Sequence, residues 1–90
     1  MKNQIIYTKE FVKLININSG FSEFGLNEIN SDFRKPGYII ISCQAALNGA
    51  GSAHCLAVIS GINFDFVTLY NGTAAVENIS LYIRIIYKKQ

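Results

Sequence analysis

The feature that most constrains the fold of this chain is a strict alternation of residue types near its C-terminal end. Apolar residues occupy every second position of this segment, namely Ile79, Leu81, Ile83, Ile85 and Tyr87. Because successive side chains of a strand point to opposite faces, this spacing places all five on one face. The segment therefore predicts a strand with one face in the core. Its other face includes Tyr82 and Ile86, and is more apolar than contact with solvent requires.

Similar alternation recurs along the chain, and helical periodicity is nearly absent. Gly, Asn and Pro interrupt it at short intervals, which is typical of an all-β sandwich or barrel. We expect six strands, near Glu10 to Ile17, Phe21 to Leu26, Tyr38 to Leu47, Ala53 to Ser60, Asn63 to Tyr70 and Asn78 to Lys88. The stretch 27–34 is either a loop or one helical turn. The predicted fold is an all-β, jelly-roll-like antiparallel β-sandwich of about six to eight short strands. It forms one domain over residues 1–90, and residues 1–9 form an arm that is flexible or reaches another subunit.

The composition indicates that some apolar surface is meant for another chain. Half of the 90 residues are hydrophobic and 16% are charged, which excludes intrinsic disorder. The length excludes large catalytic folds such as the (β/α)8 barrel. A chain of this size buries only about 60–65% of its unfolded surface. The apolar residues beyond those needed for one buried face are Tyr82, Ile86 and the second apolar set of the segment Asn63 to Tyr70. We therefore expect an oligomer.

The segment around Asn48 to Gly51 predicts a hairpin in one register, or in that register slipped by two residues. In the unslipped register Cys43 faces Cys55 and Ile41 faces Ala57 on a wholly apolar face. Directly opposed cysteines can be close enough to bridge. We expect instead two free cysteines that behave as small buried hydrophobes, because the N-terminus lacks the apolar core of a secretion signal and a reducing compartment keeps thiols free.

Residues that could carry catalysis are few. His54 is the single histidine, and on a strand its neighbour Cys55 points to the opposite face, so the two cannot form a nucleophile–base pair. The acidic residues are scattered, and no His/Cys cluster or Asp-rich loop indicates a metal site. We therefore expect no enzyme, no metal and no cofactor. A small hydrolase is the least supported alternative.

Charge and hydropathy bear on the partners. The net charge is +2 and the basic residues form no stripe interleaved with aromatics, so we expect no nucleic-acid binding. No apolar run approaches the roughly 18 residues of a membrane-spanning helix, so we expect no membrane insertion.

What remains is a binding or structural module whose turns carry amides, hydroxyls and nearby tyrosines. Such groups suit polyhydroxy ligands, and they suit ordinary turns equally well. His54 is expected to be a surface residue at the end of the hairpin. The candidate receptor-binding residues are Asn48, Ser52, His54, Asn71, Thr73 and Tyr82.

Three segments of the chain carry a resemblance to a known family. They are Lys35-Pro36-Gly37-Tyr38-Ile39-Ile40-Ile41-Ser42, the earlier Asn18-Ser19-Gly20-Phe21-Ser22-Glu23-Phe24-Gly25-Leu26, and the closing Val67-Thr68-Leu69-Tyr70-Asn71 followed by the run from Ile79 to Lys89. Together they resemble the small C-terminal head domains on tail fibres of phages that infect Gram-positive bacteria. Those domains end in a long alternating strand with Tyr-Lys-Lys or Tyr-Arg-Lys. The likeness covers nearly the whole chain from about Thr8.

The resemblance implies a homotrimeric β-sandwich head at the tip of a fibre, which contacts a host-surface saccharide or protein. Its location would be the virion, after synthesis in the cytoplasm of the bacterial host. The alternative is a structural virion protein, either a capsid decoration or a baseplate subunit, without receptor binding. Such heads usually follow a long shaft on the same chain, so we expect either a fragment of a longer fibre or a free-standing virion subunit.

Overall fold

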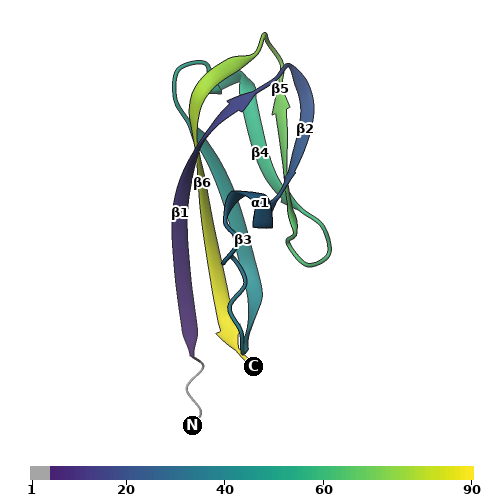
Figure 1. The fold of residues 1–90 in the computed structure, drawn as a ribbon. Coiled ribbons are helices and arrows are strands. Elements are labelled where there is room, and N and C mark those ends of the chain that lie inside the picture. Colours follow the sequence, from purple (N-terminus) through teal and green to yellow (C-terminus); the bar gives the residue numbers. More distant parts are fainter. Residues whose placement is uncertain (1–4) are drawn as a thin grey trace.

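The computed structural model describes residues 5–90, which form two antiparallel sheets of three strands each (Figure 1). The elements in chain order are β1 (Ile6–Ile17), β2 (Gly20–Gly25), α1 (Leu26–Ile29), β3 (Tyr38–Asn48), the 3-10 turn η1 (Ser52–His54), β4 (Cys55–Ser60), β5 (Phe66–Asn71) and β6 (Val76–Lys89). We call the sheet with strand order β1-β6-β3 sheet A, and the sheet with order β2-β5-β4 sheet B. The mostly β, sandwich-like fold expected from the sequence is confirmed.

Strand β6 is the central strand of sheet A, and it pairs antiparallel with β1 on one side and β3 on the other. Its inward residues are those that the alternation placed in the core. All five are buried: Ile79, Leu81, Ile83, Ile85 and Tyr87. A strand that is paired on both sides and covered on one face needs this strict period of two, because a slip of one residue would expose the entire set.

Sheet B covers only one end of the longer sheet A (Figure 1). Its central strand β5 contributes Val67 and Leu69 to the core, and β4 contributes Cys55. The molecule is therefore elongated, with extents of 52 × 20 × 19 Å. Both the start of β1 and the end of β6 lie at the end that sheet B leaves uncovered (Figure 1).

At that uncovered end, α1 and the segment leading to β3 close the core in place of a strand. Phe33 of this segment is buried, and the Tyr87 hydroxyl donates a hydrogen bond to its carbonyl oxygen. Lys9 Nζ donates to the carbonyl oxygen of Asp32 at 2.8 Å. Arg34 pairs with the Asp65 carboxylate and so ties the segment to the β4–β5 connection. The sequence allowed a loop or one helical turn here, and the structure has the helical turn α1.

The predicted β3–β4 hairpin is wrong, because the two strands belong to different sheets. Residues Gly49–His54 turn the chain from sheet A to sheet B through Gly51, whose φ of +88° favours glycine, and through η1. Cys43 consequently lies opposite Ile85, and Cys55 lies opposite Asn71. The two thiols are free, as expected.

A β-bulge in β3 also changes the predicted faces of that strand. The register with β6 shifts between Ile40 and Ser42, so Ile41 is an extra residue. Ile39 and Ile41 are exposed, whereas Ile40 and Cys43 pack against the core. Alternation alone placed Ile39, Ile41 and Cys43 on one face, because the sequence carries no mark of the bulge.

The N-terminal arm is only partly within the described structure. Residues 6–9, which we assigned to the arm, belong to β1 and pair with 85–88 of β6. Residues 1–4 lie outside the described residues. The jelly-roll connectivity and the trimer remain predictions.

Candidate functional site

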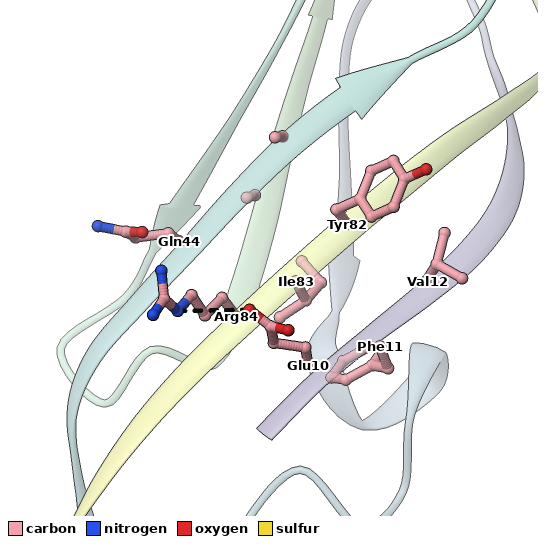
Figure 2. Close-up of a pocket in the computed structure, with 9 residues that line it drawn as sticks. Glu10, Phe11, Val12, Gln44, Tyr82, Ile83 and Arg84 are labelled. Carbon is pink, nitrogen blue, oxygen red and sulfur yellow. Dashed lines mark ion pairs between the residues drawn. The ribbon is translucent and has the colours of Figure 1, made fainter. Parts of the chain in front are cut away.

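The outer face of sheet A, which points away from the core, carries a shallow groove of about 680 Å3 (Figure 2). All three strands of the sheet contribute to it. Its outward side chains are those of Glu10, Val12, Gln44, Ala46, Tyr82 and Arg84. The volume lies within the range of small-molecule sites. The alternation that buries one face of β6 thus presents the opposite face as the floor of the groove.

The register of sheet A places polar side chains in one row across this floor. Arg84 on β6 lies opposite Glu10 on β1 and Gln44 on β3. Arg84 Nε is 3.4 Å from Glu10 Oε2, and both side chains are more than half exposed (Figure 2). An exposed pair of this kind contributes little to stability. Because both side chains are exposed, their donors and acceptors are accessible to a ligand.

The neighbouring row is apolar. Tyr82 lies between Val12 and Ala46, and Tyr82 and Val12 are 47% and 56% exposed. The aromatic ring offers a flat apolar face and a hydroxyl at its tip. A ring next to a row of amide, carboxylate and guanidinium groups suits a ligand with apolar C–H faces and hydroxyl edges, such as a sugar. Among the predicted receptor-binding residues, Tyr82 alone lies in this groove.

The other five predicted residues lie at the opposite end of the molecule from the start of β1, where the β3–β4 and β5–β6 connections meet (Figure 1). Gly72 N donates a hydrogen bond to the His54 carbonyl oxygen at 3.0 Å, which joins the two connections. The side chains of Asn48, His54 and Thr73 are exposed, and Ser52 is half-buried. The structure thus brings these four into one region, separate from Tyr82.

Asn71, the fifth of them, has a structural role. Its side chain is 1% exposed. The amide nitrogen donates to the carbonyl oxygens of Ile17 and Ala74 at 3.3 and 3.0 Å. The amide oxygen accepts from Thr73 N at 2.9 Å and from Thr73 Oγ1 at 3.0 Å. Every polar atom of this side chain is used within the fold, so it presents nothing to a ligand.

Sequence reasoning missed Glu10, Val12 and Gln44 as groove residues. Their signal exists only after the strands are paired, because β1 and β3 meet β6 from distant parts of the chain. The alternation of the last strand puts Arg84 on the same face as Tyr82, but nothing in the sequence indicates its partners on β1 and β3.

Two ionisable side chains of sheet A have pKa values that burial raises. Burial raises the pKa of the Cys43 thiol to about 11, so this thiol stays protonated near neutral pH and is a poor nucleophile. Burial, followed by the effects of Tyr7 and Cys43, raises the pKa of the Tyr87 hydroxyl. Within residues 5–90, no group of three or more His, Cys, Asp or Glu side chains could hold a metal ion.

Comparison of the chain with protein-family models, curated proteins and solved structures finds no match. Within residues 5–90, no helix has the length and apolar character needed to cross a bilayer.

Proposed function

We propose that this chain is a non-enzymatic attachment module of a phage-like particle, which binds a host-surface saccharide and acts as a homotrimer. The observation that carries the proposal is the groove on the outer face of sheet A. It combines an exposed aromatic ring, Tyr82, with the hydrogen-bonding groups of Glu10, Gln44 and Arg84. Protein sites for small ligands typically combine apolar and aromatic lining with a few placed polar groups.

The arrangement of the termini is compatible with this role. The described chain begins and ends at one end of an elongated molecule, and the exposed polar turns lie at the other (Figure 1). A module held at the first end presents its groove along the side and its turns at the tip. Turns held by a rigid sheet are common positions for recognition.

Three copies of a shallow site raise the strength of attachment without any new contact. Each groove is open and its ion pair is solvated, so a single site is expected to bind weakly. Linking several such sites on one particle raises the overall avidity by about 10²–10⁴ when they can engage together.

The test is attachment of a tagged protein to candidate host cells and to a glycan array. We expect Tyr82→Ala and Gln44→Ala to reduce binding at least about tenfold, the effect of roughly 1.4 kcal/mol per site. Ile62→Ala is the matched control, because Ile62 is almost fully exposed in the β4–β5 connection and lies outside the groove. Bare cells and a blank array would contradict receptor binding. Equal binding by the Tyr82→Ala and native proteins would contradict the groove.

A structural virion subunit is the second candidate. The observation in its favour is the apolar outer face of sheet B, which carries exposed Phe21, Leu56 and Val58. A subunit of this kind should bind isolated virus particles that lack it and should ignore host cells.

A further inference from the structure

We infer that the outer face of sheet B is the surface through which copies of this chain associate. The inference builds on the proposed homotrimer and names its interface. Five large apolar side chains from all three strands lie on this face: Phe21, Leu56, Val58, Phe66 and Tyr70. Phe21, Leu56 and Val58 are 78%, 65% and 58% exposed.

The register groups the most exposed of these side chains at one end of the sheet. Phe21, Tyr70 and Leu56 lie opposite one another on β2, β5 and β4, and Val58 lies beside them. The rings of Phe21 and Tyr70 are 4.8 Å apart between centroids. A shallow hollow lined by these residues and Thr68 lies at their centre. The result is one continuous apolar patch.

Two polar groups of this face are paired with each other. The hydroxyls of Ser60 and Thr68 lie 3.0 Å apart and hydrogen-bond to each other. Within the three described strands of sheet B, Glu23 is the one charged residue on the outer face, and it belongs to the edge strand β2. An apolar surface can therefore cover Ser60 and Thr68 without leaving either hydroxyl unpaired. A second copy of the same face is such a surface.

The area of the patch suits an interface between copies. Taking about 150–250 Å2 for a fully exposed large side chain, the five residues expose on the order of 500 Å2. That is near the upper limit for a patch on a soluble monomer, about 300–600 Å2. In a two-fold contact between copies of this face, the patch supplies more than half of the roughly 800 Å2 that each partner buries in a standard interface. In a three-fold assembly the patch is divided between two neighbouring copies.

Association through strand edges is discouraged by the sequence of sheet A. Lys13 lies on the inward side of the edge strand β1, and the other edge strand β3 contains the bulge at Ile41. Inward-pointing charges and bulges both oppose the pairing of edges between molecules. The edge strands of sheet B have only six residues each. The geometry points to contact through a face.

The outer face of sheet A is the weaker candidate for this contact. Its centre carries the Glu10–Arg84 pair and Gln44, which an apolar partner would have to desolvate. In a three-fold assembly, one half of this face on each subunit contacts the other half of the same face on the next subunit. On sheet B the β2 half offers Phe21 and the β4 half offers Leu56 and Val58, so apolar groups meet apolar groups.

The test is the mass of the protein by light scattering over a dilution series at micromolar concentrations. We expect the native protein to be an oligomer of the 10.0 kDa chain. Leu56→Glu should reduce its mass to that of one chain, about a threefold fall for a trimer. Val12→Glu is the matched control, because it places the same charge at a similarly exposed position on the outer face of sheet A, and it should leave the mass unchanged.

Phe21→Ser provides a second variant, because a side chain that is 78% exposed contributes little to folding of one chain. It should dissociate the oligomer while the circular dichroism spectrum stays native. A native monomer, an oligomer that survives both changes, or one that dissociates only with Val12→Glu would overturn the inference. A dimer that Leu56→Glu dissociates would support this interface and contradict the trimer. If Tyr82→Ala loses cell binding while its mass stays unchanged, the result would support the groove as the receptor site and would be independent of the interface on sheet B.

Discussion

Replacement of Asn71 by alanine should be among the most damaging single changes to this fold. The side chain lies at the end of β5, and its amide links the end of β1 to the β5–β6 connection through bonds to Ile17 and Ala74. Its oxygen holds Thr73 through two further bonds. The amide thus joins sheet A to sheet B at the end where their connections meet.

The expected loss follows from these four hydrogen bonds. Each contributes about 0.5–1.5 kcal/mol net, and a buried group left unpaired costs about 1–3 kcal/mol. Thr73 and Ala74 are exposed and recover part of the loss by bonding to water, whereas Ile17 is buried. We expect Asn71→Ala to lower the free energy of unfolding by about 2–4 kcal/mol. For a domain of this size that corresponds to a fall in Tm of roughly 10–25 °C.

The assay is urea unfolding followed by circular dichroism, with all variants at one protein concentration because association adds to apparent stability. Thr73→Val is the control. It removes one exposed hydroxyl and its bond to Asn71, and should cost about 0.5–1 kcal/mol. If Asn71→Ala is no more destabilising than Thr73→Val, the structural role assigned to Asn71 is refuted.

Two further predictions concern the core of sheet A. Ile83→Asp should prevent folding, because it buries an unpaired charge in the central strand; a soluble, native-like protein would show that the strand register is wrong. Cys43 should be alkylated slowly at pH 8 in a Cys55→Ser background, since a thiol with a pKa of about 11 is about one part in a thousand thiolate there. Burial in the fold raises the pKa of the Cys43 thiol above its ordinary value of 9.0. The free energy of unfolding should therefore be unaffected by this thiol below pH 9 and should fall as the pH rises from 9 toward 11, because the unfolded chain then loses the proton more readily than the folded one. Equal alkylation rates in native and urea-unfolded protein, measured by mass spectrometry, would contradict the burial of this thiol.

The strands were predictable from sequence because each carries its own alternation between turn residues. Strand β6 is the clearest case, since its five inward residues are the buried ones. The pairing of β3 was not predictable in the same way. Its alternation fits β4 as well as it fits β6, and the hydrophobic pattern cannot choose between two apolar partners. The conformation of Gly51, with η1 after it, directs the chain to the other sheet, and the bulge at Ile41 then alters the faces.

The candidate site was predictable only in part. The excess of apolar character behind β6 indicated that Tyr82 has a role outside the core. The row formed by Glu10, Arg84 and Gln44 depends on a register among three strands from different parts of the chain. Asn71 precedes Gly72, and an Asn-Gly pair is a common turn signal. The sequence therefore predicts an accessible turn residue, whereas the burial of Asn71 depends on contacts that the sequence does not reveal.

The central position of β6 has a consequence for the order of events in folding. Strands β1 and β3 do not pair with each other, and each takes its partner from β6, which follows all other strands in the chain. Sheet A therefore cannot assemble during synthesis until β6 has left the ribosome. Most contacts join residues distant in sequence, which makes folding slow. During that interval the unpaired edges of β1 and β3 are open to aggregation. The bulge at Ile41 forms only when β3 pairs with β6, so it protects the finished sheet, whereas the charge of Lys13 is present in the β1 segment from the start.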